Sequence, residues 1–228
     1  ANLLHLYTTT NMTADDIHQA GLQQVHRIEA EMDRLFRTLG RTDGSVADRS
    51  ARLALDLQYK NPTSDESREL IMRDIDGIIR DALVRSQPLF DIRPRSQVIA
   101  KPYPQFSEAN GAANYFPPAS DGSRPGTFQF PRRRDRMTRF TLRTTVYHET
   151  VPGHHFQLAL QAENKNLPRF RQLAFFGSTS AFTEGWGLYA ERLADEMGLF
   201  SSDLARLGML AEDSMRAARL VVDTGLHA

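Results

Sequence analysis

Several features that define whole classes of protein are absent from this 228-residue chain. It contains no cysteine, which excludes disulfide bonds and metal sites built on thiolates. No run of 18 or more apolar residues occurs, so the sequence predicts no membrane span. The 28 basic and 28 acidic residues leave no net charge. A neutral chain has no overall field that attracts phosphate, and we expect no nucleic-acid partner.

The two ends of the chain also lack familiar signals. The sequence begins with Ala1 rather than Met and has no basic start, long apolar stretch or cleavage site of a secretory signal. It stops at Ala228 directly after a helix-like stretch, without a polar tail. We therefore expect a fragment of a longer protein, a single catalytic region over residues 1–228.

What remains is a composition typical of globular proteins, with 40% hydrophobic and 25% charged residues. Helical periodicity follows a capping signal at Thr13, recurs near Leu53 and again after Thr63, and returns from Thr138 onwards. Residues 88–131 hold eight of the eleven prolines, and 97–100 and 126–130 resemble short strands. These patterns predict a mainly α fold with a small β-ribbon or sheet. Three regions follow one another: a helical region over residues 1–87, an extended region over 88–137 and helices over 138–228.

Three of the seven histidines lie close together in the last region, in the segment His148-Glu149-x-x-x-Gly153-His154-His155. In many zinc hydrolases one imidazole binds the metal, the next carboxylate takes a proton from water, and a second imidazole follows one helical turn later. The sequence thus predicts Zn²⁺ as cofactor, His148 as a ligand and Glu149 as the general base.

The spacing of these histidines requires an interrupted helix. The second imidazole normally lies four residues on, but Pro152 occupies that position here. A proline removes a backbone donor and clashes with the carbonyl four residues earlier, and Gly153 tolerates unusual backbone angles. We therefore expect a kink at Pro152-Gly153 that turns His154 back beside His148. His155 stays open as the alternative ligand.

A third ligand is needed, since catalytic zinc takes three protein ligands and leaves one position open. Glu184 is the best candidate, because it begins the segment Glu184-Gly-Trp-Gly-Leu-Tyr-Ala-Glu191 on a separate predicted helix. Glu191 lies on the same helical face and suits a partner for an imidazole N–H. Each of these residues taken alone fits an ordinary structural role equally well, whereas the combination favours a metal site.

The motifs around these residues resemble those of a known family. Tyr147-His148-Glu149-x-x-Pro152-Gly153-His154-His155 and Thr183-Glu184-Gly185-Trp186-Gly187 are similar to signatures of the bacterial family catalogued as domain of unknown function 885. Further similar blocks lie at 12–22, 115–126 and 219–227. Members resemble zincin-type metallopeptidases and are usually longer. The resemblance therefore implies a zincin-like helical catalytic domain and a peptide substrate. A location outside the cytoplasm stays open for the full-length bacterial protein.

The remaining roles in peptide cleavage are assigned as hypotheses. A tetrahedral oxyanion needs a hydrogen-bond donor, for which His227 and Tyr189 are the catalytic candidates. Tyr115 and Arg219 are candidate substrate-binding residues, although an ion pair of Arg219 with Asp223 is the simpler expectation. The segment 126–130 is a candidate edge strand that pairs with an extended peptide, or else an ordinary strand.

Three competing functions stay open from the sequence. The first is a helical binding module without catalysis that retains a vestigial metal site. The second is a metal-dependent amidase or esterase, because the same chemistry serves those bonds. The third is nucleic-acid binding through the arginines at 132–134, 136 and 139. A solvated face, or a face that binds substrate carboxylates, is the better interpretation of that cluster because the chain is neutral overall.

Overall fold

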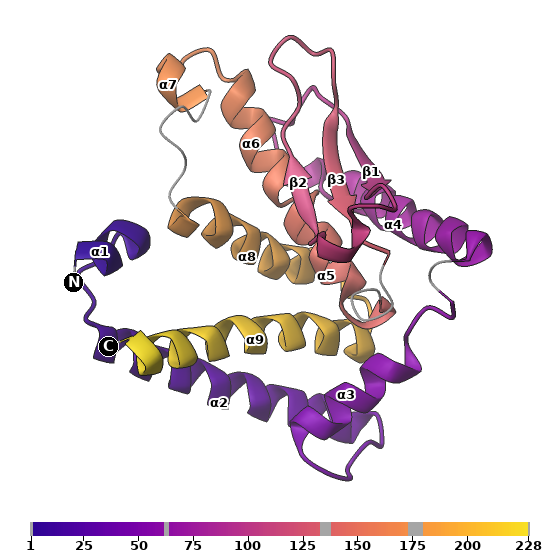
Figure 1. Cartoon of the computed structure of the whole chain (residues 1–228), viewed down its shortest axis with the longest axis vertical. Coiled ribbons are helices and arrows are strands. Elements are labelled where there is room, and N and C mark those ends of the chain that lie inside the picture. The colour runs from indigo at the N-terminus through magenta and orange to yellow at the C-terminus, as the bar shows by residue number, and fades with distance from the viewer. Residues whose placement is uncertain (1, 62–63, 133–137, 173–179, 228) are drawn as a thin grey trace.

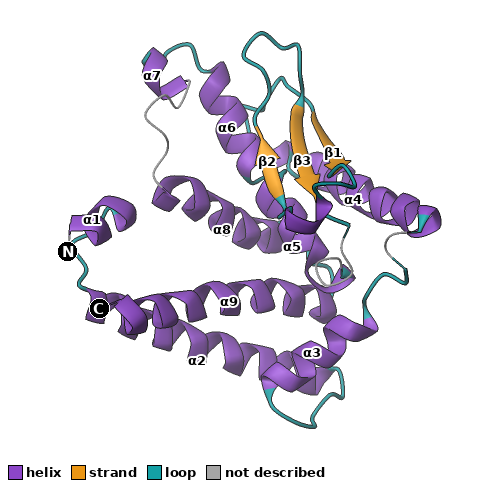
Figure 2. Ribbon diagram, in the orientation of Figure 1, coloured by secondary structure: helices purple, strands orange, loops and turns teal. Residues whose placement is uncertain are grey.

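The computed structural model describes residues 2–61, 64–132, 138–172 and 180–227. It is mainly helical with a small three-stranded sheet, which confirms the predicted fold class (Figure 1, Figure 2). The first third of the chain forms α1 (Asn2–Thr8), α2 (Ala14–Thr38), α3 (Val46–Asp56) and α4 (Asp65–Arg85). The last third forms α5 (Arg139–Glu149), α6 (His154–Glu163), α7 (Arg169–Gln172), α8 (Ser180–Glu196) and α9 (Asp203–His227).

Capping boxes start α2 and α3. The Thr13 side chain accepts a hydrogen bond from the backbone N–H of Asp16, whose carboxylate accepts one from the backbone N–H of Thr13, as the sequence predicts. Ser45 and Asp48 form the same motif at the start of α3. The helix expected near Leu53 therefore begins earlier than predicted, at Val46, because this capping box lies well before the apolar positions that predict the helix. At α4 the N-cap is Ser64, and Thr63 lies outside the described residues.

The sheet consists of β1 (Val98–Pro102), β2 (Asn114–Phe116) and β3 (Gly126–Phe130) in the order β1-β3-β2. The pairing of β1 with β3 is parallel, and that of β2 with β3 is antiparallel. Of the two interpretations of 126–130, an ordinary strand in a small sheet is confirmed and an edge strand is wrong. Both sides of β3 are occupied, because 114–116 supplies a second partner that its short length concealed in the sequence.

Helix α5 lies at the centre of the molecule and packs against α4, α8 and α9. Helices α2 and α9 run side by side, so the beginning and the end of the chain are in contact (Figure 1). Apolar side chains from all three regions of the sequence form one buried cluster. Its largest fully buried members include Phe36, Ile75, Phe128, Tyr147 and Phe200.

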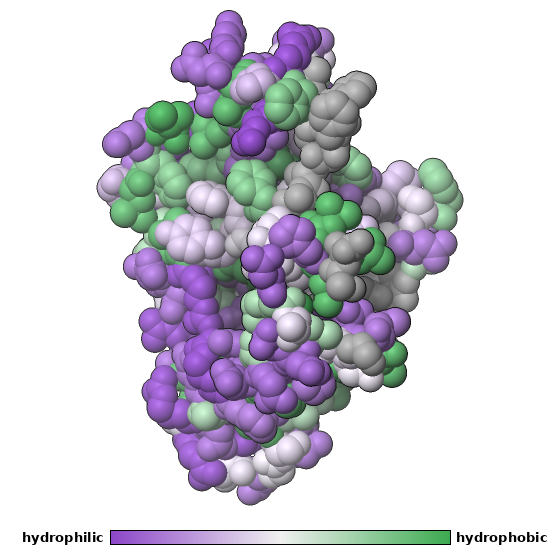
Figure 3. Space-filling model, turned by 90° about the vertical axis from the view of Figure 1, so that its left-hand side faces the viewer, coloured by the Kyte–Doolittle hydropathy of each residue, from purple (hydrophilic) through white to green (hydrophobic). Residues whose placement is uncertain are grey.

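The surface is mixed in character. On the face shown in Figure 3, hydrophilic residues cover most of the lower half, whereas hydrophobic residues gather in the upper half. None of the helices within the described ranges combines the length and the hydropathy needed to cross a membrane.

The arginine cluster is only partly described, since residues 133–137 lie outside the described ranges. Of the other members, Arg132 pairs with the buried Glu108 at 3.1 Å. Arg139 pairs with Asp74 at 3.1 Å and lies over the Tyr59 ring, 4.3 Å from its centroid. Both of these arginines therefore contact carboxylates of the chain itself.

Candidate metal centre

The helix break predicted at Pro152-Gly153 is present in the structure. Helix α5 ends at Glu149 and α6 begins at His154. The indole N–H of Trp186, on α8, reaches the carbonyl oxygens of Pro152 and Gly153 at 3.0 and 3.1 Å. The break thus has hydrogen-bond partners on the neighbouring helix.

As a result of the break, the rings of His148 and His154 lie side by side. Their centroids are 4.6 Å apart and their planes are inclined by 81°. Glu184 approaches both from α8, with 3.2 Å between its Oε2 and His148 Nε2 and 3.7 Å between its Oε1 and His154 Nε2. The three residues each offer one ligand atom, and these atoms all lie within 4.8 Å of one another. Two chain segments 36 residues apart thus converge on one point.

The other side of the His148 ring is fixed by α8 as well. Its Nδ1 lies 2.8 Å from Oε1 of Glu191, which is fully buried. A Cβ atom at Gly187 would lie 2.4 Å from this ring, so only glycine permits the close packing of α5 on α8 here. Burial alone would lower the pKa of His148, but hydrogen bonds to Glu184 and Glu191 raise that pKa to about 9. The surrounding carboxylates therefore favour positive charge at this position.

Glu149 is buried beside this cluster. Its Oε2 atom has no hydrogen-bond partner among the described residues. Burial raises the pKa of the Glu149 carboxyl to about 7, although the nearby His148 opposes the shift. A carboxyl group whose pKa lies near neutrality is suited to exchanging protons with a reacting water.

The structure also distinguishes the two adjacent histidines. Both ring nitrogens of His155 are used: Nδ1 accepts from the hydroxyl of Tyr115 at 2.8 Å, and Nε2–H donates to the carbonyl oxygen of Ser96 at 3.1 Å. His154 Nδ1 is buried without a hydrogen-bond partner among the described residues. The cluster with His148 and Glu184 accordingly contains His154 and not His155.

The other predicted site residues lie elsewhere. Tyr115 is buried at the sheet, and its hydroxyl is directed to His155. Tyr189 is 54% exposed on α8, with its ring 5.7 Å from that of Trp186. Arg219 and His227 are exposed on α9. Among the described residues, no hydrogen bond or ion pair joins any of these four to the cluster, and their roles stay predictions.

The end of α9 differs in detail from what the sequence suggests. Asp223 lies 3.5 Å from the His227 imidazole, whereas the sequence predicts that it pairs with Arg219. His227 Nδ1 also donates to the Asp223 carbonyl oxygen at 3.0 Å. Of this pair, the His227 side chain suits the helix end, because it forms a hydrogen bond with one of the last carbonyl oxygens of α9.

Two charged residues next to the cluster were not identified from the sequence. Arg216 Nη2 lies 3.4 Å from Glu191, and its Nη1 lies 3.7 Å from Glu212. The spacing of Glu212 and Arg216 gives an ordinary i,i+4 pattern on α9, so nothing in the sequence connected them with histidines some 60 positions earlier.

Comparison with known proteins relates this chain to solved structures. It resembles the crystal structure of a candidate lipoprotein from Colwellia psychrerythraea, with a TM-score of 0.93 and 35% identity over 99% of this chain and 39% of that one. It also resembles a candidate lipoprotein of unknown function from Shewanella oneidensis, with a TM-score of 0.71 and 17% identity over 99% of this chain and 42% of that one. The second likeness shows the fold alone. This chain spans about two-fifths of either relative.

A search among curated proteins finds no match. A family model described as a bacterial protein of unknown function matches residues 1–228, the whole of the chain. The chain therefore belongs to the DUF885 family of bacterial proteins.

Proposed function

We propose that this chain carries the metal site of a zinc-dependent hydrolase that cleaves peptide bonds. The convergence of His148, His154 and Glu184 beside a buried carboxyl group, that of Glu149, is the observation that supports this proposal. Two imidazoles and one carboxylate are a ligand set found in catalytic zinc sites.

The distances fit one ion after a small adjustment. Ligand atoms about 2 Å from a tetrahedral zinc ion lie roughly 3.4 Å from one another. The two oxygens of Glu184 lie 3.2 and 3.7 Å from the imidazoles of His148 and His154, and one ligand atom from each residue lies within 4.8 Å of the others, so the three must draw closer to bind one ion. The charges around the site also favour a bound cation. Three carboxyl groups, those of Glu149, Glu184 and Glu191, lie close enough to influence it, and among the described residues they are opposed by one arginine, Arg216. Zinc would supply Lewis acidity and lower the pKa of a coordinated water.

The protein groups have separable tasks in this proposal. Glu149 accepts the proton of the attacking water and returns it to the leaving amine, since its unpaired oxygen and its pKa near neutrality suit both steps. Glu191 accepts the Nδ1–H of His148 and so leaves Nε2, which faces Glu184 and His154, as the nitrogen that would bind a metal in place of a proton.

Substrate placement is less constrained than the metal site. β2 is an edge strand within the described sheet, and an extended peptide could pair with it through main-chain hydrogen bonds. Tyr189 and His227 stay proposals as oxyanion donors, as do Tyr115 and Arg219 for substrate binding. The solved relatives are more than twice as long as this chain, so we propose that residues outside it extend the substrate site. Their description as candidate lipoproteins supports a location outside the cytoplasm.

The test combines metal content with activity. Protein purified without chelator is expected to contain about one zinc per chain, and a mixture of peptides is expected to be cleaved in a zinc-dependent way. Glu149→Gln should retain zinc and lose about 10²–10⁴-fold in rate, as removal of a general base does. Glu196→Gln, which changes an exposed carboxylate at the end of α8, is the matched control. Zinc-free protein, or full activity in Glu149→Gln, would refute the proposal.

A further inference from the structure

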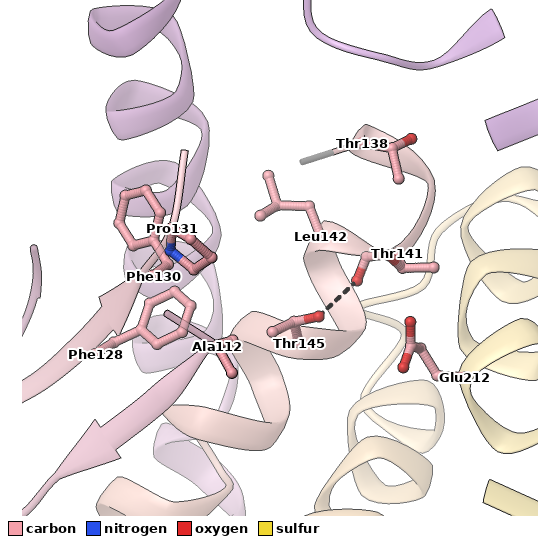
Figure 4. Close-up of a pocket in the computed structure, with 10 residues that line it drawn as sticks. Ala112, Phe128, Phe130, Pro131, Thr138, Thr141, Leu142, Thr145 and Glu212 are labelled. Carbon is pink, nitrogen blue, oxygen red and sulfur yellow. Dashed lines mark hydrogen bonds between the residues drawn. The ribbon is translucent and has the colours of Figure 1, made fainter. Parts of the chain in front are cut away.

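A cavity of about 170 Å³ lies beside α5, between the sheet and α9. Figure 4 shows aromatic and proline side chains on one side of it and Glu212 on the other, with two threonines of α5 between them. Its size is similar to that of an engineered cavity of ~150 Å³ that binds benzene. The space therefore suits one amino-acid side chain. Its lining is about equally apolar and polar: the apolar part includes Ala112, Ala113, Phe128, Phe130 and Leu142, and the polar part consists of threonines and Glu212.

The cavity is close to the proposed catalytic group. Thr141 and Thr145 line it, and the next position on the same face of α5 is Glu149. Residues four apart on a helix are separated by about 6 Å along the axis. A side chain in this cavity would thus belong to a residue near the bond whose hydrolysis Glu149 is proposed to assist as general base. Residues 112 and 113 precede β2, so a peptide paired with that edge strand would pass the cavity entrance.

One end of the cavity carries an incompletely paired negative charge. Arg216 is shared between Glu212 and Glu191 at 3.7 and 3.4 Å, both longer than a good N–H···O bond. Its Nη1 has no hydrogen-bond partner among the described residues. Burial raises the pKa of Glu212, and Arg216, His148 and a hydrogen bond with Thr141 only partly oppose this shift. Because two carboxylates share one arginine, a second cation at this end would be stabilised.

We propose that this cavity binds a substrate side chain with an aliphatic stem and a cationic end, that of lysine or arginine. The apolar walls would contact the methylene groups while Glu212 pairs with the charged end, which is how such amphipathic side chains are commonly accommodated. The role of the cavity as a specificity pocket rests on the proposed hydrolase function. Its preference for a cationic side chain can be tested by binding alone.

The binding test uses n-pentylamine, which is protonated at neutral pH, and n-pentanol as its uncharged analogue, with affinities measured by ligand-observed NMR. Wild type should bind the amine at least tenfold more tightly than the alcohol. Glu212→Gln keeps the shape and should abolish this difference, whereas the exposed control Glu196→Gln should preserve it. Ala112→Leu, which narrows the cavity, should weaken both ligands. Equal affinity for the two ligands in wild type, or unchanged selectivity in Glu212→Gln, would overturn the proposal.

Sequencing the products from a peptide mixture separates this proposal from the hydrolase function. Cleavage next to lysine or arginine that loses its preference in Glu212→Gln supports both. Cleavage without any basic preference retains the hydrolase and overturns the pocket. Selective amine binding without cleavage of any peptide retains a cation-binding cavity and refutes the hydrolase.

Discussion

The two faces of α6 carry adjacent histidines with nearly the same burial and very different surroundings. His154 and His155 are 6% and 2% exposed, and burial lowers the pKa of each to about 4. His155 faces the sheet, where both of its nitrogens have hydrogen-bond partners. His154 faces α8, with Nδ1 unpaired in the described portion of the chain and Nε2 directed at Glu184. The bonding of the two rings, rather than their burial or pKa, separates the candidate ligand from the structural residue.

Exchanging each histidine for glutamine tests this contrast most strongly. His154→Gln should weaken zinc binding by more than about 100-fold, because loss of a direct ligand exceeds the 10–100-fold cost of losing a residue that supports one. His155→Gln should keep zinc binding within a few-fold of wild type. Competition with a chromophoric chelator measures both. Loss of zinc in His155→Gln with retention in His154→Gln would reverse the assignment.

A smaller effect is expected at Glu191, which acts through His148. Glu191→Gln should reduce zinc affinity by about 10–100-fold, because the amide is a weaker acceptor for the imidazole N–H. The isosteric change Glu196→Gln at the exposed end of α8 serves as its control. An affinity indistinguishable from that of the control would mean that the buried hydrogen bond of 2.8 Å does not affect the metal.

On the sheet side, Tyr115→Phe should affect stability and leave zinc binding unchanged. The change removes the donor to His155 Nδ1 and leaves that buried nitrogen unpaired, at a cost of about 1–3 kcal/mol in the free energy of unfolding. Denaturant titration measures this value. The exposed Tyr189→Phe should change it by less than about 0.5 kcal/mol. A change in zinc affinity with Tyr115→Phe would connect the two faces of α6.

The smallest expected effect at neutral pH is on the pH dependence of the free energy of unfolding, through the protonation of His155. Its pKa is about 4 in the folded chain and near 6.5 in an unfolded one, so the unfolded chain binds more protons between these values. Its contribution to stability is therefore complete above about pH 6.5 and is lost as the pH falls toward 4. Buried Glu149, with its pKa raised to about 7, acts in the opposite direction.

Comparison of variants isolates this contribution. Unfolding of metal-free wild type and His155→Gln, followed between pH 4 and 7, should give a flatter pH dependence for the variant. The exposed His26→Gln on α2 should follow wild type. Parallel curves for His155→Gln and wild type would show that the buried imidazole is protonated as easily as a free one.

The predictability of the fold depended on whether the signal was local. Thr13 and Asp16 are three positions apart and fixed the start of α2 correctly. The equivalent pair Ser45 and Asp48 is equally local, so the start of α3 is also predictable from the sequence. The position of β3 within the sheet was not local, because it depends on pairing with the three-residue strand β2, whose sequence alone carries almost no strand signal.

The same distinction applies to the candidate site. The break near Pro152 follows from proline's missing N–H and was predictable, as was the group of His148 with His154. Glu212 and Arg216 were not predictable, because their proximity to α5 is set by the packing of α9, on which they form an ordinary surface-like pair. The hydrogen bond that His155 Nδ1 accepts was likewise not predictable, because its donor, Tyr115, lies forty positions earlier in the sequence.

The hydrogen bonds from Trp186 to the carbonyl oxygens at the helix break give this protein a built-in optical probe. The chain has a single tryptophan, so its tryptophan fluorescence has one source. That source lies two residues after Glu184 and touches the junction that brings the two imidazoles together. Emission intensity and wavelength should therefore report whether the break between α5 and α6 keeps its structure during metal titration or unfolding, without any added label.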